Sequence, residues 1–97
     1  MDRDKALQIL SEHKDELKEK HGVKSIAIFG STARNEATPD SDVDILVEFE
    51  RPIGLFELSR LQFHLESILA RDVDLTTPGG LIPQLRDQIL EEAVYAP

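Results

Sequence analysis

A glycine–serine pair, followed at a fixed distance by two aspartates, constrains this chain more than any other feature. Gly30 and Ser31 come directly after the apolar run 25–29, and ten residues separate Ser31 from Asp42. One residue separates Asp42 from Asp44. A strand that runs into a Gly-Ser turn favours phosphate binding, because glycine allows close backbone approach and the next residues open a helix whose N–H groups attract anions. Two carboxylates at i and i+2 of a strand point the same way and can share metal ions. The pattern predicts chemistry on a nucleoside triphosphate.

Apolar spacing along the chain predicts an alternation of helices and strands. We expect helices over 2–20, 31–35 and 55–70 and strands over 24–29, 43–49 and 72–76. Pro83 suits the first turn of a last helix, with Ile82, Leu85 and Ile89 on its buried face. The order predicts an α/β (α+β) fold, in which a small mixed sheet of about three strands carries its helices mainly on one face.

Length and composition limit the class of protein. The 97 residues, 40% of them apolar and 31% charged, are expected to form one domain, 1–97. The chain has no cysteine, no apolar stretch of membrane-spanning length and no signal peptide, so we expect it in the cytoplasm. The net charge of −8 argues against direct, sequence-independent binding of nucleic acid. An anionic nucleotide would need local neutralisation by a metal or a few cations.

The aspartates at alternating positions, Asp40, Asp42 and Asp44, crowd like charges with no lysine nearby in the sequence. Their repulsion lowers stability unless a cation offsets it, and magnesium takes carboxylate and triphosphate oxygens together. A solvated strand edge is the alternative interpretation. The third predicted strand presents two outward carboxylates, Asp72 at its entrance and Asp74 at its centre. We expect Asp74 to complete the site, with Asp72 as a group that supports the ligands from outside.

The spacing Gly-Ser, ten residues, Asp-x-Asp and a later strand aspartate resembles that of the DNA polymerase β-like nucleotidyltransferase superfamily. The stretch 29–49 is similar to its minimal nucleotidyltransferase (MNT) branch, and 71–78 and 86–95 are similar to later segments of that branch. The resemblance covers nearly the whole chain. It implies a polymerase β-like nucleotidyltransferase fold.

The resemblance also implies roles for particular residues. Gly30 and Ser31 would hold the triphosphate of ATP, and Arg34 would contact it. Asp42 and Asp44 would bridge two Mg²⁺ ions, while Asp74 would bind the metal that activates the acceptor hydroxyl. Where the family pattern leads us to expect glycine after Arg34, this chain has Asn35. Because asparagine tolerates unusual backbone angles, we expect the loop to be retained.

MNT proteins of this kind often pair with a HEPN-domain toxin. The resemblance therefore implies an antitoxin that transfers AMP from ATP to a hydroxyl of the toxin, with tyrosine as the expected acceptor.

Two other functions stay open from the sequence. One is a catalytically silent MNT-like module that neutralises its partner by contact alone. The other is transfer to a small molecule, which needs an added domain to hold the acceptor. On helix 55–70, Phe56 and Phe63 are expected in the core.

Overall fold

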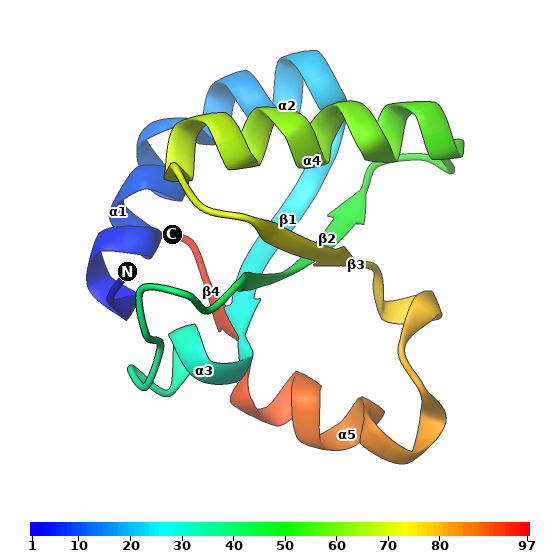
Figure 1. The fold of residues 1–97 in the computed structure, drawn as a ribbon. Coiled ribbons are helices and arrows are strands. Elements are labelled where there is room, and N and C mark those ends of the chain that lie inside the picture. The colour runs from blue at the N-terminus through cyan, green and yellow to red at the C-terminus, as the bar shows by residue number, and fades with distance from the viewer.

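The computed structural model describes residues 1–97 and contains a four-stranded sheet with helices on both sides (Figure 1). The elements in chain order are α1 (Arg3–Glu12), α2 (Lys14–His21), β1 (Val23–Phe29), α3 (Gly30–Ala33), β2 (Val43–Phe49), α4 (Leu55–Leu69), β3 (Val73–Thr76), the 3₁₀ turn η1 (Pro78–Gly80), α5 (Pro83–Glu92) and β4 (Val94–Tyr95).

The sheet is mixed, with strand order β3-β2-β1-β4. β1 pairs antiparallel with β2 on one side and with β4 on the other, whereas β2 and β3 run parallel. The parallel pair needs a crossover, which α4 supplies. The predicted mixed sheet is confirmed, although it has a fourth strand. β4 is only two residues long and forms where Val94 pairs with Ile28.

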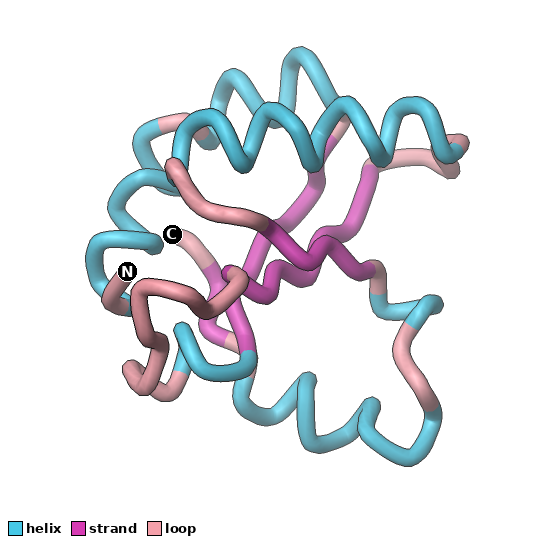
Figure 2. The backbone as a smooth tube through the Cα atoms, in the orientation of Figure 1, coloured by secondary structure: helices cyan, strands magenta, loops and turns pink.

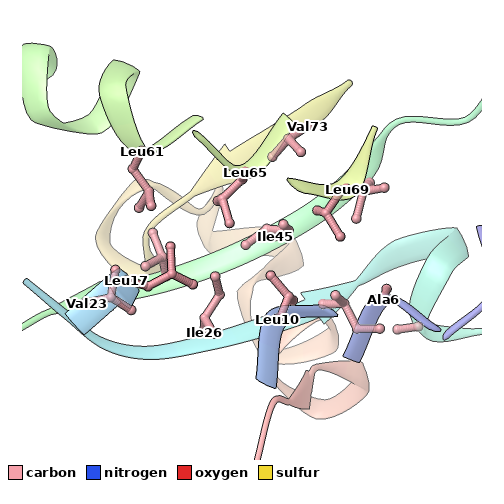
Figure 3. Packing of buried hydrophobic residues seen from close by; sticks show 14 residues of the cluster. Ala6, Leu10, Leu17, Val23, Ile26, Ile45, Leu61, Leu65, Leu69 and Val73 are labelled. Carbon is pink, nitrogen blue, oxygen red and sulfur yellow. The ribbon is translucent and has the colours of Figure 1, made fainter. Parts of the chain in front are cut away.

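One face of the sheet is covered by α1, α2 and α4, while α5 lies on the opposite side (Figures 1 and 2). The covered face holds the apolar core, in which the side chains of alternate strand residues meet those of the three helices (Figure 3). The core cluster comprises Ala6, Leu10, Leu17, Val23, Ile26, Ile28, Ala33, Val43, Ile45, Val47, Leu61, Leu65, Leu69 and Val73. Since side chains alternate across a strand, Asp44 and Asp74 point to the other face, as predicted.

The predicted helix 2–20 is wrong in one respect, because it is divided into α1 and α2 at His13. The backbone of His13 leaves the helical region, with φ −102° and ψ 9°. Its ring Nδ1 lies 2.8 Å from the carbonyl oxygen of Ile9, which also accepts the His13 backbone N–H at 3.2 Å. The ring and the backbone N–H of His13 thus share one carbonyl oxygen at the point where the helix divides.

Two predictions of burial are also wrong. No residue of α5 is buried, and Ile82 and Leu85 are 60% and 45% exposed. On α4, Phe56 and Phe63 are 87% and 70% exposed, so neither belongs to the core. The sheet instead contacts the core residues Leu61, Leu65 and Leu69, which form one face of α4. Position 63 lies on the opposite face of the helix.

None of the helices combines the length and apolar character that crossing a membrane requires.

The two faces of α4 give a direct test of the packing. Leu65→Ala should lower the free energy of unfolding by about 2–5 kcal/mol, because it leaves a cavity against the sheet. Phe63→Ala on the exposed side should change it by less than about 0.5 kcal/mol. Urea denaturation of both variants would measure the difference, and equal losses would contradict the assignment of the core face.

Candidate active site

The register of the parallel strands brings two carboxylates together. Asp44 of β2 lies directly opposite Asp74 of β3. The backbone N–H of Val43 donates to the carbonyl oxygen of Asp72 at 2.9 Å, which locks the starts of the two strands. Asp42, two residues before Asp44, extends the same row. The predicted ligands Asp42, Asp44 and Asp74 are thus neighbours on the face away from the core.

Electrostatics show how closely these groups interact. The pKa of the half-buried Asp44 carboxyl is raised from 3.8 to about 6, first by burial and then by the negative charges of Asp74 and Asp42. The positive charge of Arg34 opposes this shift. A carboxylate held against two others is stabilised in its charged form by a cation.

Hard oxygen donors on neighbouring strands suit Mg²⁺, and the raised pKa of Asp44 shows that the charge at this position lacks sufficient compensation from the protein. The three side chains are not yet arranged as a closed coordination cage, since no group of three or more His, Asp or Glu residues has that geometry. The chemistry of the donors therefore fits Mg²⁺, but their arrangement does not yet do so. Binding would require the carboxylates to move closer together.

Gly30 is needed for the position of Asp44. Its φ of +66° lies in the left-handed region, and a Cβ atom there would collide with the Asp44 carboxylate, lying only 3.1 Å from Cγ. Any other residue at position 30 would displace that carboxylate or strain the turn. Asn35, which stands where glycine was expected, also takes the left-handed conformation, with φ 61°. Asparagine thus adopts the unusual backbone angle on which the expectation for this loop was based.

The predicted phosphate-binding residues gather beside the carboxylates, but donors of Gly30 and Arg34 are already engaged by glutamates. Ser31 is half-buried at the start of α3. The backbone N–H of Gly30 donates to Oε1 of Glu92 at 2.9 Å. Arg34 donates from Nη1 to Oε2 of the same Glu92 at 3.1 Å, and from Nε to Glu36 at 3.4 Å. These carboxylates raise the pKa of Arg34.

Glu92 is the residue that sequence reasoning missed. It lies 62 positions from Gly30 and, although it falls within the segment 86–95, nothing in that segment by itself indicates a contact with Gly30. Only the pairing of β4 with the edge of β1 brings it to the site.

Comparisons with known proteins agree with this geometry. Residues 10–96 match the model of a family described as a nucleotidyltransferase domain. Protein adenylyltransferase MntA of Thermococcus cleftensis is 45% identical over 87 residues, which cover 90% of this chain and 88% of that protein. A solved structure described as a minimal nucleotidyltransferase is 41% identical, covers 97% of this chain and 95% of its own, and has a TM-score of 0.80.

A further solved structure contains a tri-AMPylated Shewanella oneidensis HEPN toxin in complex with an MNT antitoxin. The matched chain of that structure is 22% identical to this one, with a TM-score of 0.65. The match covers 93% of this chain and 71% of the matched chain. At this identity the likeness concerns the fold.

The chain belongs to the nucleotidyltransferase domain family.

The raised pKa of Asp44 predicts a pH dependence of stability in the metal-free protein. Because its folded-state pKa of about 6 exceeds the ordinary 3.8, the folded state binds more protons between these values. The free energy of unfolding should therefore fall as pH rises through this window. Asp44→Asn should remove that contribution, which is on the order of 1 kcal/mol after allowing for solvent screening of a half-exposed group.

Urea denaturation in EDTA at several values of pH from 4 to 7 would measure this effect. Asp87→Asn, which removes an exposed charge from α5, is the matched control. An Asp44→Asn variant that keeps the wild-type slope would contradict the assignment.

Proposed function

We propose that this protein transfers AMP from ATP to a hydroxyl of a HEPN-type toxin partner, with tyrosine as the acceptor, and so acts as an antitoxin. The observation that carries the proposal is the placement of Asp44 opposite Asp74, beside Gly30 and Ser31. The adenylyltransferase name of the Thermococcus relative supports the transferred group. The AMPylated toxin in the structurally similar complex supports the kind of partner.

Asp42 and Asp44 would hold two Mg²⁺ ions, one of them shared with Asp74. When bound, the metal supplies charge neutralisation for the triphosphate, the acceptor oxygen and the leaving pyrophosphate. The Ser31 hydroxyl would donate to a phosphate oxygen, and the Arg34 guanidinium would bind another. Gly30 contributes chiefly space for the Asp44 carboxylate, because its own N–H donates to Glu92.

In the reaction, the acceptor oxygen forms a bond to the α-phosphorus of ATP, and the bond from that phosphorus to the β-phosphate oxygen breaks. The acceptor loses its proton to solvent and pyrophosphate leaves. Most of the catalysis would come from positioning the reacting groups and from stabilising the developing negative charge.

The partner would supply the surface that orients the acceptor. On the side of the sheet that carries the carboxylates lies α5 (Figures 1 and 2), a helix that buries none of its residues. A net charge of −8 suits a basic, nucleic-acid-binding protein in the cytoplasm. An added adenylate would bring negative charge and bulk to the partner's nucleic-acid site, which explains how transfer would neutralise a toxin.

Removing the metal ligands should abolish transfer. The Asp42→Asn/Asp44→Asn protein should retain its fold and lose transfer by at least about 10³-fold, because both ions depend on these carboxylates. Intact-mass spectrometry of the partner after incubation with ATP and Mg²⁺ would detect added adenylate. Asp40→Asn, in the exposed loop before the pair, is the control.

If the double variant neutralises the partner as well as the wild type does, without any change in mass, the protein is a contact-only binding module. Transfer retained by the double variant would instead show that the metal ligands are assigned wrongly.

The choice between the two carboxylates of β3 has its own test. Asp74→Asn should reduce the rate of transfer much more than it reduces ATP affinity, because the proposed role is on the acceptor side. Asp72→Asn should have little effect, since Asp72 engages β2 through its backbone carbonyl. Steady-state kinetics of both variants would separate kcat from KM. A damaging Asp72→Asn beside a mild Asp74→Asn would reverse the assignment.

A further inference from the structure

The Glu92 side chain lies between two groups of the proposed nucleotide site. Its carboxylate accepts the Gly30 N–H through Oε1 at 2.9 Å and the Arg34 Nη1 through Oε2 at 3.1 Å. The side chain is only 22% exposed. Its position follows from the sheet, because Val94 pairs antiparallel with Ile28 and the same register carries Glu92 alongside Gly30.

The contacts of Arg34 leave one part of its guanidinium free. Glu92 binds Nη1, and Glu36 binds Nε at 3.4 Å. No hydrogen bond within the chain engages Nη2, which carries two of the five N–H donors of an arginine. Of the two acidic partners, Glu36 is 67% exposed, so the more buried Glu92 provides the firmer contact.

The free end of Arg34 is close enough to the carboxylates to act on a ligand held there. The Glu92 carboxylate that binds Arg34 also accepts the Gly30 N–H, and Gly30 lies directly against the Asp44 carboxylate. Without a fixed partner, a side chain that is 46% exposed would sample many rotamers. An arginine that is already oriented loses less entropy when it binds a phosphate.

We propose that Glu92 is a positioning residue for nucleotide binding: it holds Arg34 through Nη1, so that the Nη2 amine faces the triphosphate beside Asp42 and Asp44. This inference rests on the proposed function. It assigns to the end of α5 a role in substrate affinity, although that helix buries none of its residues.

The charge of Glu92 makes the sign of its effect informative. A carboxylate near an anionic ligand repels it, and this one also competes for an arginine donor. Positioning requires that the gain from an oriented Arg34 exceed that repulsion. If repulsion or competition dominates, removing the charge strengthens nucleotide binding, whereas the proposal requires that binding weaken.

Glu92→Gln is the discriminating variant, because its amide oxygen can still accept the Gly30 N–H while the charge-assisted bond to Arg34 is lost. Glu91→Gln removes the same charge from the neighbouring exposed position and is the matched control. Calorimetric titration with Mg²⁺ and ATP, and separately with Mg²⁺ and inorganic triphosphate, measures affinity without relying on turnover. Urea denaturation checks that each variant is folded.

We expect Glu92→Gln to weaken binding of both ATP and triphosphate about tenfold, the size of one lost charge-assisted contact. In transfer assays KM for ATP should rise while kcat changes less than about twofold. In an Arg34→Ala background, Glu92→Gln should cause no further loss, because both changes remove the same contact.

Three results would overturn the proposal. Unchanged affinity would make Glu92 a structural cap for Gly30, and tighter binding would make it a competitor of the triphosphate. Additive losses in the double variant would show that Glu92 does not act through Arg34. Absence of ATP binding by the wild-type protein would overturn the proposed function as well, and that outcome is distinct from these three.

Discussion

The parallel, in-register pairing of β2 with β3 is the constraint on which the rest of the site depends. It aligns Val43 with Val73 and Ile45 with Leu75, pairs that lie in the core or pack against it. The intervening pair, Asp44 and Asp74, is thereby forced together on the opposite face. Like charges placed opposite each other destabilise a sheet. Apolar packing on one face therefore maintains an unfavourable arrangement on the other, which is the arrangement that a cation would relieve.

Glycine at position 30 is the second element of this arrangement. The turn after β1 has to pass close to the Asp44 carboxylate, and the absence of a side chain makes that approach compatible with a left-handed backbone. The same turn directs the Gly30 N–H toward Glu92. Gly30, interpreted from the sequence as part of a phosphate-binding turn, thus acts through the space that it leaves and through its backbone conformation.

Much of the fold could be predicted, because its signals are local. The alternation of apolar and acidic residues over 43–49 indicates both a strand and the face on which Asp44 lies, since only apolar side chains suit the core. β4 could not be predicted, because two residues carry no periodicity. Glu92 was missed because only the pairing of β4 with β1 brings it alongside Gly30. On α4 apolar residues occupy more than one face. The sequence therefore indicated correctly that Leu61 and Leu65 face the sheet, but it did not show that Phe56 and Phe63 stay exposed.

The weak attachment of α5 has a consequence for dynamics. The core cluster ends at Val73, and α5 adds no buried residue to it. Only β4, which pairs with β1, and the side chains of Val94 and Ala96 attach the end of this segment to the core. We therefore expect α5 to open as a local unfolding unit, with a free energy below that of global unfolding. Such an opening would release Arg34 while the core stayed folded. Amide exchange at Gly30 would then follow the stability of this peripheral segment, and the order of the nucleotide site would be set at the edge of the molecule rather than by its core.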